Sequence, residues 1–380
     1  MPGSKGERFI FSLRELSGAL ADLGTLLPLM LGTIAVVGLA PTPVLLGFAV
    51  FYISTAFYYR LPIPVQPMKA VAAVLLTSGI TPAGLAASGV MIGIVLLVLG
   101  LTGWIGRIAR IVPQSVLAGL QLGLGLALGL LSLDLMGTAP VIAAATFVLL
   151  LGLLLVPRYP SALIALAVAV ALAQGFGELS VVLNTTRVFA LPSLPSLEDI
   201  ERAVSIFVLP QLSLTLTNAV LLTALIAGDY FGDRATHVTP ARLSVTSGLA
   251  NLLLTPLGAL PMCHGAGGLA AHYRFGARSG MAPLALGVAL LAVTVMPGGV
   301  ALAALAAIPV AGLGALLLMA SIELALTKRL FDCKPSCWPV IVVTAGVTVW
   351  IDPFWGLLTG SCAELGRLAL VRGLRRDVRS

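Results

Sequence analysis

The sequence predicts an all-α protein that crosses a membrane about fourteen times. Of its 380 residues, 59% are hydrophobic and only 10% are charged, and the mean hydropathy is +1.07. Soluble domains carry about 25% charged residues. Apolar runs that are long enough to span a bilayer as helices follow one another along most of the chain. The composition therefore indicates a polytopic membrane protein and leaves no segment that could form a soluble domain.

The first half of the chain contains seven apolar runs. They lie near residues 15–38, 43–59, 62–78, 83–103, 113–133, 139–156 and 161–176. The third run is interrupted by Pro62, Pro64 and Pro67. Proline lacks a backbone N–H and disfavours helical geometry in the residue before it. This part is therefore predicted to be extended, with a helix starting after Pro67.

The second half repeats the pattern after a polar connection at 177–205. Its runs lie near residues 206–228, 242–259, 260–273, 282–296, 300–326, 339–350 and 353–370. The third run is again interrupted: Pro261–Cys263 is predicted to be extended, and a new helix is expected to start at about His264–Gly268. Within the connection, residues 197–206 have the amphipathic pattern of a surface helix.

The basic residues indicate how the chain is oriented. The formal net charge is +7, and the Lys and Arg residues gather in alternate short connections and in the C-terminal tail. Cytoplasmic loops of membrane proteins carry such an excess. We therefore expect the N-terminus (1–14) and the basic tail (371–380) to be cytoplasmic, in a multi-pass protein of the plasma or inner membrane. The same distribution points to lipid, and not nucleic acid, as the partner of these charges.

The span count and the two interrupted runs together indicate a secondary transporter. Because seven is odd, a second group of seven spans inserts upside down relative to the first. The chain is thus divided into inverted repeats at 15–176 and 206–370, joined by an extracytoplasmic linker at 177–205. Matching broken helices in two such halves mark a substrate site. The first N–H groups of a helix lack acceptors and carry partial positive charge, so two facing helix starts form a site for an anion.

Candidate substrate-binding residues come from the broken segments and from the first and eighth spans. They are Gln66, Met68, Lys69, His264, Gly265, Ala266, Gly267, Asp22, Thr25, Gln211, Thr215 and Asn218. Lys69, the one basic residue placed within a span, is a counter-charge for an anionic substrate, a structural partner of Asp22, or a lysine whose charged end reaches the cytoplasmic side. His264, the only histidine placed within a span, is a donor to the substrate, the carrier of a coupled proton or a packing residue.

The sequence indicates neither an enzyme nor a bound metal. The His-Glu-x-x-His and Gly-x-Ser-x-Gly motifs are missing, so no catalytic residue is predicted. Cys333 and Cys337 are spaced loosely like half of a metal site, but no second pair accompanies them. No cofactor is expected beyond a coupling proton.

Three blocks of sequence carry a family resemblance. They are GALADLGTLLP (18–28), PVQPMK (64–69) and PMCHGAGG (261–268), the last followed by YRFGARSG (273–280). With these blocks the chain resembles the molybdate transporter family of the sulfate permease superfamily, whose inverted-repeat fold is shared with nucleobase transporters. The resemblance implies a core domain (15–103 plus 206–296) that moves against a gate domain (113–176 plus 300–370). It also implies that the extended stretches of segments 3 and 10 cross near the site.

The resemblance implies a secondary active transporter that imports molybdate by alternating access. Proton coupling is a hypothesis that rests on Asp22 and His264. Molybdate and sulfate are tetrahedral dianions of similar size, and backbone N–H donors bind either. A sulfate transporter, a nucleobase transporter of the same fold and an anion channel therefore stay open as alternatives. Tungstate is a further candidate ligand, and the sequence is compatible with a homodimer.

Overall fold

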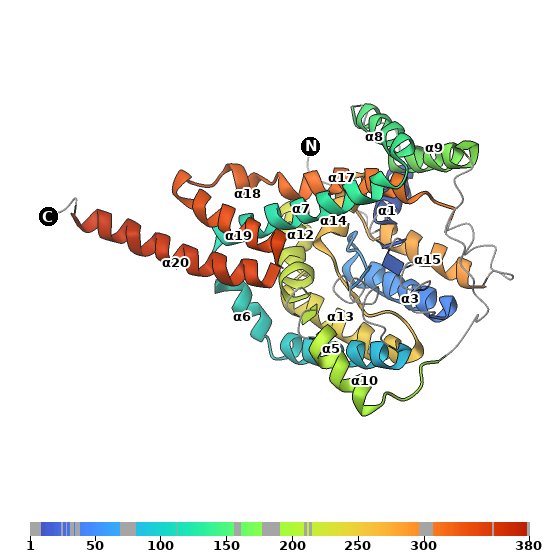
Figure 1. The fold of residues 1–380 in the computed structure, drawn as a ribbon, viewed down its shortest axis with the longest axis horizontal. Helices are drawn as coiled ribbons and strands as arrows, with labels where there is room; N and C mark the ends of the chain where they lie inside the picture. The colour runs from blue at the N-terminus through green and yellow to red at the C-terminus, as the bar shows by residue number, and fades with distance from the viewer. Residues whose placement is uncertain are drawn as a thin grey trace.

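The structure is a computed structural model, and it describes most of the chain. The described residues are 9–23, 26–27, 29–30, 34, 39–68, 81–111, 113–155, 161–176, 191–208, 211–212, 215–295, 307–351 and 353–377. They form helices almost throughout, together with one two-stranded sheet (Figure 1). The predicted mostly helical class is thus confirmed.

In the first half, the helices that correspond to the predicted spans 43–59, 83–103, 113–133, 139–156 and 161–176 agree with them to within a few residues. Most of the predicted span 15–38 after α1, and the helix predicted to follow Pro67, lie outside the described residues. The elements are α1 (Leu13–Ala21), α3 (Pro41–Tyr59), β1 (Gln66–Pro67), α5 (Pro82–Leu101), α6 (Trp104–Ile111), α7 (Gln114–Gly137), α8 (Pro140–Leu154) and α9 (Ser161–Phe176). Proline stands in the first turn of α3, α5 and α8, where its missing N–H costs no helical hydrogen bond. The helix α6 occupies a connection that the sequence analysis left without structure.

In the second half, the elements are α10 (Leu197–Arg202), η1 (Ala203–Val208), η2 (Thr215–Leu222), α12 (Thr223–Phe231), η3 (Gly232–Ala235), α13 (Pro240–Leu254), η4 (Thr255–Leu257), β2 (Met262–Cys263), α14 (Ala266–Arg274), α15 (Met281–Val295), α17 (Val310–Ala325), α18 (Lys328–Phe331), η6 (Pro335–Cys337), α19 (Trp338–Trp350) and α20 (Pro353–Asp377). The predicted surface helix is α10, which begins with a capping box between Ser196 and Asp199.

The eighth predicted span departs from regular helical geometry. It contains two π-helical segments, η1 and η2, before it continues as α12. Thr223 Oγ1 donates to the carbonyl oxygen of Asn218, five residues earlier, at 3.1 Å. Wide turns of this kind are rare and occur frequently at functional sites. Hydropathy alone does not reveal them, because the segment is apolar in either geometry.

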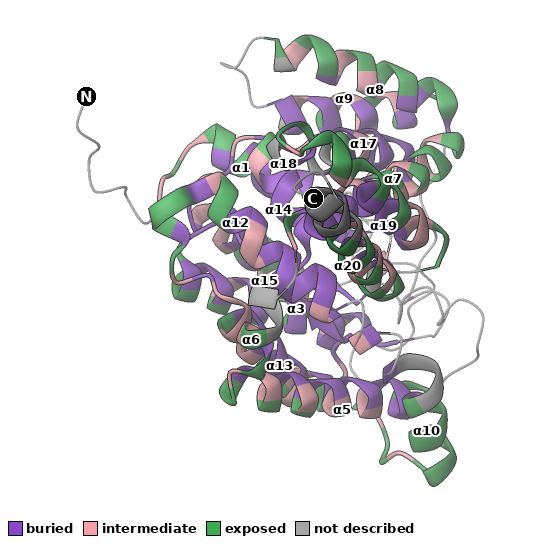
Figure 2. Ribbon diagram, turned by 90° about the vertical axis from the view of Figure 1, so that its left-hand side faces the viewer, coloured by how far each residue is buried: buried purple, intermediate pink, exposed green. Residues whose placement is uncertain are grey.

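The outer surface has the character expected of a protein in lipid. Three described helices, α3, α5 and α7, are long and apolar enough to cross a membrane, and several shorter apolar helices accompany them. Large apolar side chains such as Val98, Leu130 and Leu253 are exposed. Figure 2 shows exposed positions along the outer faces of helices such as α5 and α8. In water such a surface is unfavourable, so these faces are expected to contact lipid.

The helices pack in two groups that each mix early and late segments. In one group α3 packs against α15, and α5 packs against α13. In the other, α7 packs against α17 and α19, α19 against α20, and α8 against α9 (Figure 1). Glycines permit the closest approach: a Cβ added at Gly248 of α13 would lie 2.8 Å from the carbonyl oxygen of Gly93 in α5. Helix α14 contacts both groups, through α1 and α17.

Candidate substrate site

The two broken segments meet at the centre of the protein. Strands β1 and β2 pair antiparallel, with Gln66 opposite Cys263 and Pro67 opposite Met262. The Met68 N–H donates to the Pro261 carbonyl oxygen at 2.9 Å and extends the pairing by one bond. The prolines in both stretches prevent a helix, so each satisfies part of its backbone from the other. The predicted crossing of segments 3 and 10 is confirmed.

A buried amide on α13 holds β2 in place. Asn251 Nδ2 donates to the Met262 carbonyl oxygen at 2.6 Å, and the Met262 N–H donates to Asn251 Oδ1 at 2.8 Å. The side chain thus acts as a neighbouring strand for one residue. The sequence analysis did not single out Asn251. The available signal was a lone amide within the apolar run 242–259, since such groups in a membrane need partners.

Helix α14 begins directly after β2, as predicted. Its first residue is Ala266, and Gly265 precedes it in extended geometry without a side-chain cap. The N–H groups of its first turn therefore point towards the crossing and supply partial positive charge. All of Gly265, Ala266 and Gly267 are buried. This turn has the donors and the sign of charge that an oxyanion needs.

Glycine at 265 and 268 lets polar side chains lie directly against this turn. A Cβ at Gly265 would collide with the carboxamide of Gln66, which lies on β1. A Cβ at Gly268 would lie 2.5 Å from Asp22 Oδ1 and would also collide with Gln66 Nε2. The helix start, β1 and the end of α1 therefore converge within one small volume, which brings together the candidate residues Asp22 and Gln66.

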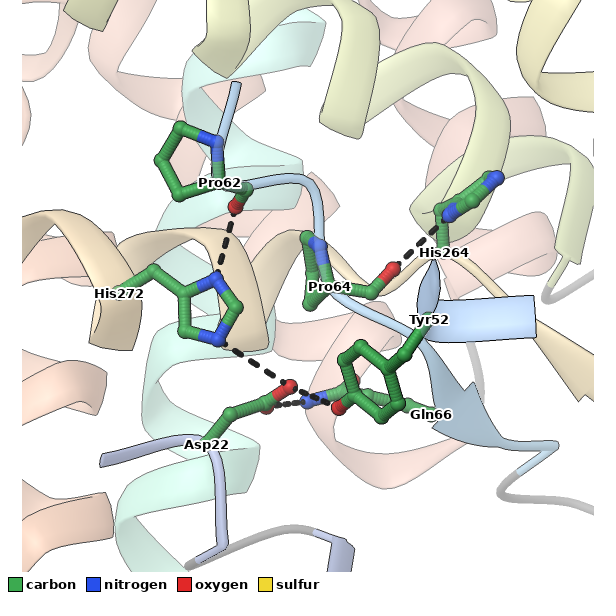
Figure 3. Close-up of polar contacts among 7 residues, drawn as sticks. All are labelled: Asp22, Tyr52, Pro62, Pro64, Gln66, His264 and His272. Carbon is green, nitrogen blue, oxygen red and sulfur yellow. Dashed lines mark hydrogen bonds and ion pairs between the residues drawn. The ribbon is translucent and has the colours of Figure 1, made fainter. Parts of the chain in front are cut away.

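Asp22 is the centre of a buried polar cluster (Figure 3). Tyr52 of α3 donates its hydroxyl to Asp22 Oδ2 at 2.7 Å, and Gln66 Nε2 donates to Asp22 Oδ1 at 2.6 Å. The exposed fractions of these three residues are 1% or less. A buried carboxylate is stable only when it is hydrogen-bonded or paired, and Tyr52 and Gln66 supply two hydrogen bonds here.

The fourth member of the cluster is His272, near the end of α14. Its Nδ1 lies 2.8 Å from the Pro62 carbonyl oxygen, and its Nε2 lies 3.6 Å from Asp22 Oδ2 (Figure 3). A carbonyl oxygen only accepts, so Nδ1 carries a proton. With Nε2 unprotonated, its lone pair would face a carboxylate oxygen. Nε2 has no hydrogen-bond partner within the described structure, and it faces a carboxylate oxygen.

His272 corrects the sequence analysis, which placed only His264 within a span. His272 is completely buried. The sequence puts it one residue before Tyr273-Arg274, at the polar end of an apolar run, where a histidine is usually exposed at an interface. Only the fold of α14 against β1 and α1 encloses it.

His264 has both ring nitrogens occupied by the protein. Nδ1 donates to the Pro64 carbonyl oxygen at 2.8 Å, and Nε2 lies 2.9 Å from Thr246 Oγ1. Thr246 Oγ1 lies in turn 2.8 Å from the hydroxyl of Tyr59. The imidazole therefore fastens the segment before β1 to α13 and the end of α3. In this arrangement it has no proton to offer to a substrate.

The remaining candidates are distributed as follows. Gln211, Thr215 and Asn218 are buried in the eighth span, where Gln211 Nε2 donates to Thr215 Oγ1 at 2.8 Å. The segments η2 and α12 contact α14, and α1 contacts it too, so α14 has parts of both the first and the eighth span as neighbours. Met68 is buried beside the crossing. Thr25 and Lys69 lie outside the described residues.

Comparison with known proteins decides the family. The model of a family described as "Molybdate transporter of MFS superfamily" matches residues 14–128 and 203–324. Molybdate transporter 2 of Arabidopsis thaliana is 30% identical over 408 aligned residues, which cover 93% of this chain and 84% of that protein. The chain belongs to the molybdate transporter family. Its members named here are transporters and not enzymes.

Solved structures place this molybdate transporter family member in the fold of the sulfate permeases. The transmembrane domain of a cyanobacterial bicarbonate transporter, BicA, matches with a TM-score of 0.60 at 18% identity, covering 90% of this chain and 96% of that one. Murine Slc26a9, an anion transporter solved in the inward-facing state, matches with a TM-score of 0.60 at 13% identity, covering 98% and 70%. At these identities the likeness shows the fold alone.

Proposed function

We propose that this protein is a secondary active transporter that imports molybdate across a cell membrane by alternating access. The substrate class is supported by the family, since the Arabidopsis relative is named a molybdate transporter. One structural observation carries the proposal. The pairing of β1 with β2 brings three groups to one buried point between the two broken segments. They are the start of α14, the Gln66 carboxamide and the Asp22–His272 pair.

The anion is proposed to bind at the first turn of α14. The unpaired N–H groups of that turn favour negative charge. Gly265 and Gly268 carry no side chain, so the Gln66 carboxamide and Asp22 Oδ1 lie directly against this turn. Lys69, which lies two residues after the end of β1 in the sequence, remains the proposed counter-charge. The remaining candidates from the first and eighth spans, Thr25, Thr215 and Asn218, stay proposed wall residues.

The pairing of helices supports two inverted repeats and two moving bodies. The second span packs on the eleventh (α3 with α15), and the ninth packs on the fourth (α13 with α5). In two seven-span repeats, the second span corresponds to the ninth and the fourth to the eleventh. The two pairings are therefore equivalent when the repeats are exchanged. The same exchange maps α7 with α19 onto α17 with α8. We propose that the first group of helices is the core domain and the second is the gate domain, within fourteen spans.

Alternating access is supported by the closure of the site. Asp22, Gln66, Met68 and His264 are each 1% exposed or less. An ion in water reaches them only if the helices around them separate. Relative motion of the core and gate domains on one side of the membrane, and then on the other, provides this access.

Proton coupling follows from the charges at the site, with His272 in place of His264 as the partner of Asp22. Asp22 Oδ1 lies beside the first turn of α14, where the dianion is proposed to bind. An ionised Asp22 would repel that dianion across a short distance in a medium of low dielectric constant. A proton added to the Asp22–His272 pair removes this repulsion and makes their own contact favourable. We propose that this proton enters with the anion.

The substrate proposal is tested by calorimetric titration of the purified protein with molybdate, sulfate and tungstate. We expect molybdate to bind more tightly than sulfate. Gln66→Ala should weaken molybdate binding by about tenfold, because a hydrogen bond to a charged group is lost. Gln121→Ala removes a buried amide from α7, far along the chain from the site, and serves as the matched control. Equal weak binding of both anions would remove the molybdate assignment.

The coupling proposal is tested with His272→Gln in proteoliposomes. Glutamine keeps a donor for the Pro62 carbonyl but does not titrate. We expect molybdate uptake by this variant to lose its dependence on an imposed pH gradient, whereas His237→Gln, outside the cluster, keeps it. Uptake by His272→Gln that still rises with the gradient as in the unaltered protein would show that another group carries the proton.

A further inference from the structure

A second concentration of positive charge lies at the end of α3, apart from the Asp22 cluster. The basic residues there line a pocket of about 400 Å³. The lining residues are Tyr58, Tyr59, Arg60, Leu61, Arg234, His237 and Arg242. A water molecule takes up about 30 Å³ in the liquid, so the pocket has room for a hydrated oxyanion. No carboxylate is among these lining residues, and the transport mechanism above does not use any of them.

Arg60 occupies a backbone conformation that disfavours a side chain. Its φ is +54°, and it is the one non-glycine residue with positive φ in the described part of the chain. Its N–H closes α3 by donating to the Ala56 carbonyl oxygen at 3.0 Å. Glycine or asparagine fills such a position more easily. Among the described residues, the exposed guanidinium of Arg60 has no hydrogen-bond or ion-pair partner.

The other two arginines are held in place without being neutralised. Arg234 Nη2 donates to the carbonyl oxygen of Arg278 at 3.0 Å, and Arg242 Nη1 donates to that of His237 at 3.2 Å. Carbonyl oxygens carry no net charge, so both guanidiniums keep theirs. Asp233, the acidic neighbour of Arg234 in the sequence, makes no ion pair within the described structure. Three uncompensated positive charges therefore face one pocket.

We propose that this pocket is a second anion site, which binds a phosphate-class oxyanion. Guanidinium groups present paired N–H donors that match phosphate oxygens, and their charge strengthens each bond. Such a phosphate comes either from solution or from the headgroup of an anionic lipid, because basic pockets at the cytoplasmic ends of membrane helices bind headgroups. The distribution of basic residues assigns this end of α3 to the cytoplasm.

The pocket is also connected to the substrate site, so the two must be separated in any test. Tyr59 lines the pocket, and its hydroxyl begins the chain through Thr246 and His264 to the Pro64 carbonyl oxygen. A variant of Gln66 weakens the substrate site without touching the pocket. Anion binding that survives Gln66→Ala is therefore not binding at the substrate site.

The first arm of the test measures thermal unfolding in a neutral detergent, with sodium phosphate replacing sodium chloride at constant ionic strength. We expect a saturable rise in Tm for the unaltered protein and for Gln66→Ala. Arg60→Asn removes the charge but suits the positive φ, so the fold is kept; its apparent phosphate affinity should fall about tenfold. Arg60→Lys should retain most of the effect, and Arg107→Gln, exposed on α6, should retain all of it.

The second arm uses phosphatidylcholine nanodiscs with or without phosphatidylglycerol, in the absence of free phosphate. A rise in Tm with phosphatidylglycerol that Arg60→Asn abolishes assigns the site to lipid phosphate. A response to free phosphate alone that depends on Arg60 assigns it to a soluble anion. If neither response depends on Arg60, the proposal is wrong. If the phosphate response disappears in Gln66→Ala, the anion binds only at the substrate site, and the pocket proposal fails while the transport proposal stands.

Discussion

At the scale of single residues, the structure assigns different tasks to the two histidines of the tenth segment. His264 is bonded on both sides and holds the segment before β1 in position, whereas Nε2 of His272 lies 3.6 Å from Asp22 Oδ2. The two histidines differ in the group that lies next to their Nε2 atom. Thr246 has a hydroxyl that occupies Nε2 of His264, while Nε2 of His272 faces a carboxylate.

The glycines of the first turn of α14 are the residues least able to change. Gly268→Ala places a methyl group against Asp22 Oδ1 and Gln66 Nε2. Because overpacking a buried site costs about 1–3 kcal/mol, we expect a lowered free energy of unfolding and loss of molybdate uptake. Gly129→Ala in α7 is the control, because its Cβ would meet only Ser321 Oγ, at 3.5 Å. Gly268→Ala with normal uptake would show that the Asp22–Gln66 contact is not needed.

At the scale of elements, the site depends on two strands of two residues each that cannot stand alone. Their mutual bonds are few, and a lone strand pair of this length is unstable. Helix α13 supports β2 through Asn251, and His264 supports the segment before β1. The helices of the core domain therefore act as the frame on which the broken segments are held.

Loss of the Asn251 amide should release β2. Asn251→Ala leaves the N–H and carbonyl of Met262 buried without partners, which we expect to lower the free energy of unfolding by about 2–4 kcal/mol. Thermal unfolding and molybdate binding measure the effect.

Ser247→Ala is the matched control, one turn earlier on the same helix. The Ser247 hydroxyl oxygen is buried without a hydrogen-bond partner, so its removal should be neutral or slightly stabilising. If the two variants had the same stability, the Asn251 clamp would have no energetic importance.

At the scale of the whole molecule, the proposed alternating access requires the proposed core and gate domains to move past each other. Besides side-chain packing, a hydrogen bond crosses the boundary between them. The Ala162 N–H at the start of α9 donates to Ser17 Oγ of α1 at 2.9 Å. In a rigid protein this bond would persist, whereas alternating access requires the surfaces around it to separate.

A disulfide across that boundary should stop transport. In a background without native cysteines, oxidation of Ser17→Cys with Ala162→Cys is expected to reduce molybdate uptake by at least about tenfold, with recovery after reduction. Gly129→Cys with Ser321→Cys joins α7 to α17 inside the gate domain and should leave uptake unchanged. Full uptake by the oxidised Ser17–Ala162 variant would contradict motion between these two helices.

The sequence by itself determined the class of protein, most helix positions and the two broken segments. These features depend on local properties: runs of apolar side chains, and prolines that forbid a helix wherever the rest of the chain lies. Asp22 and Gln66 were identifiable for the same reason, as polar groups in apolar runs that need partners.

Only the tertiary structure decided which partners they have. Tyr52, Gln66 and His272 reach Asp22 from positions 30, 44 and 250 residues away in the chain, and Asn251 reaches Met262 from another helix. The π-helical turns of the eighth span and the basic pocket around Arg60 are equally invisible to hydropathy. Contacts between distant segments follow from how helices pack, and hydropathy is the same for many different packings of the same spans.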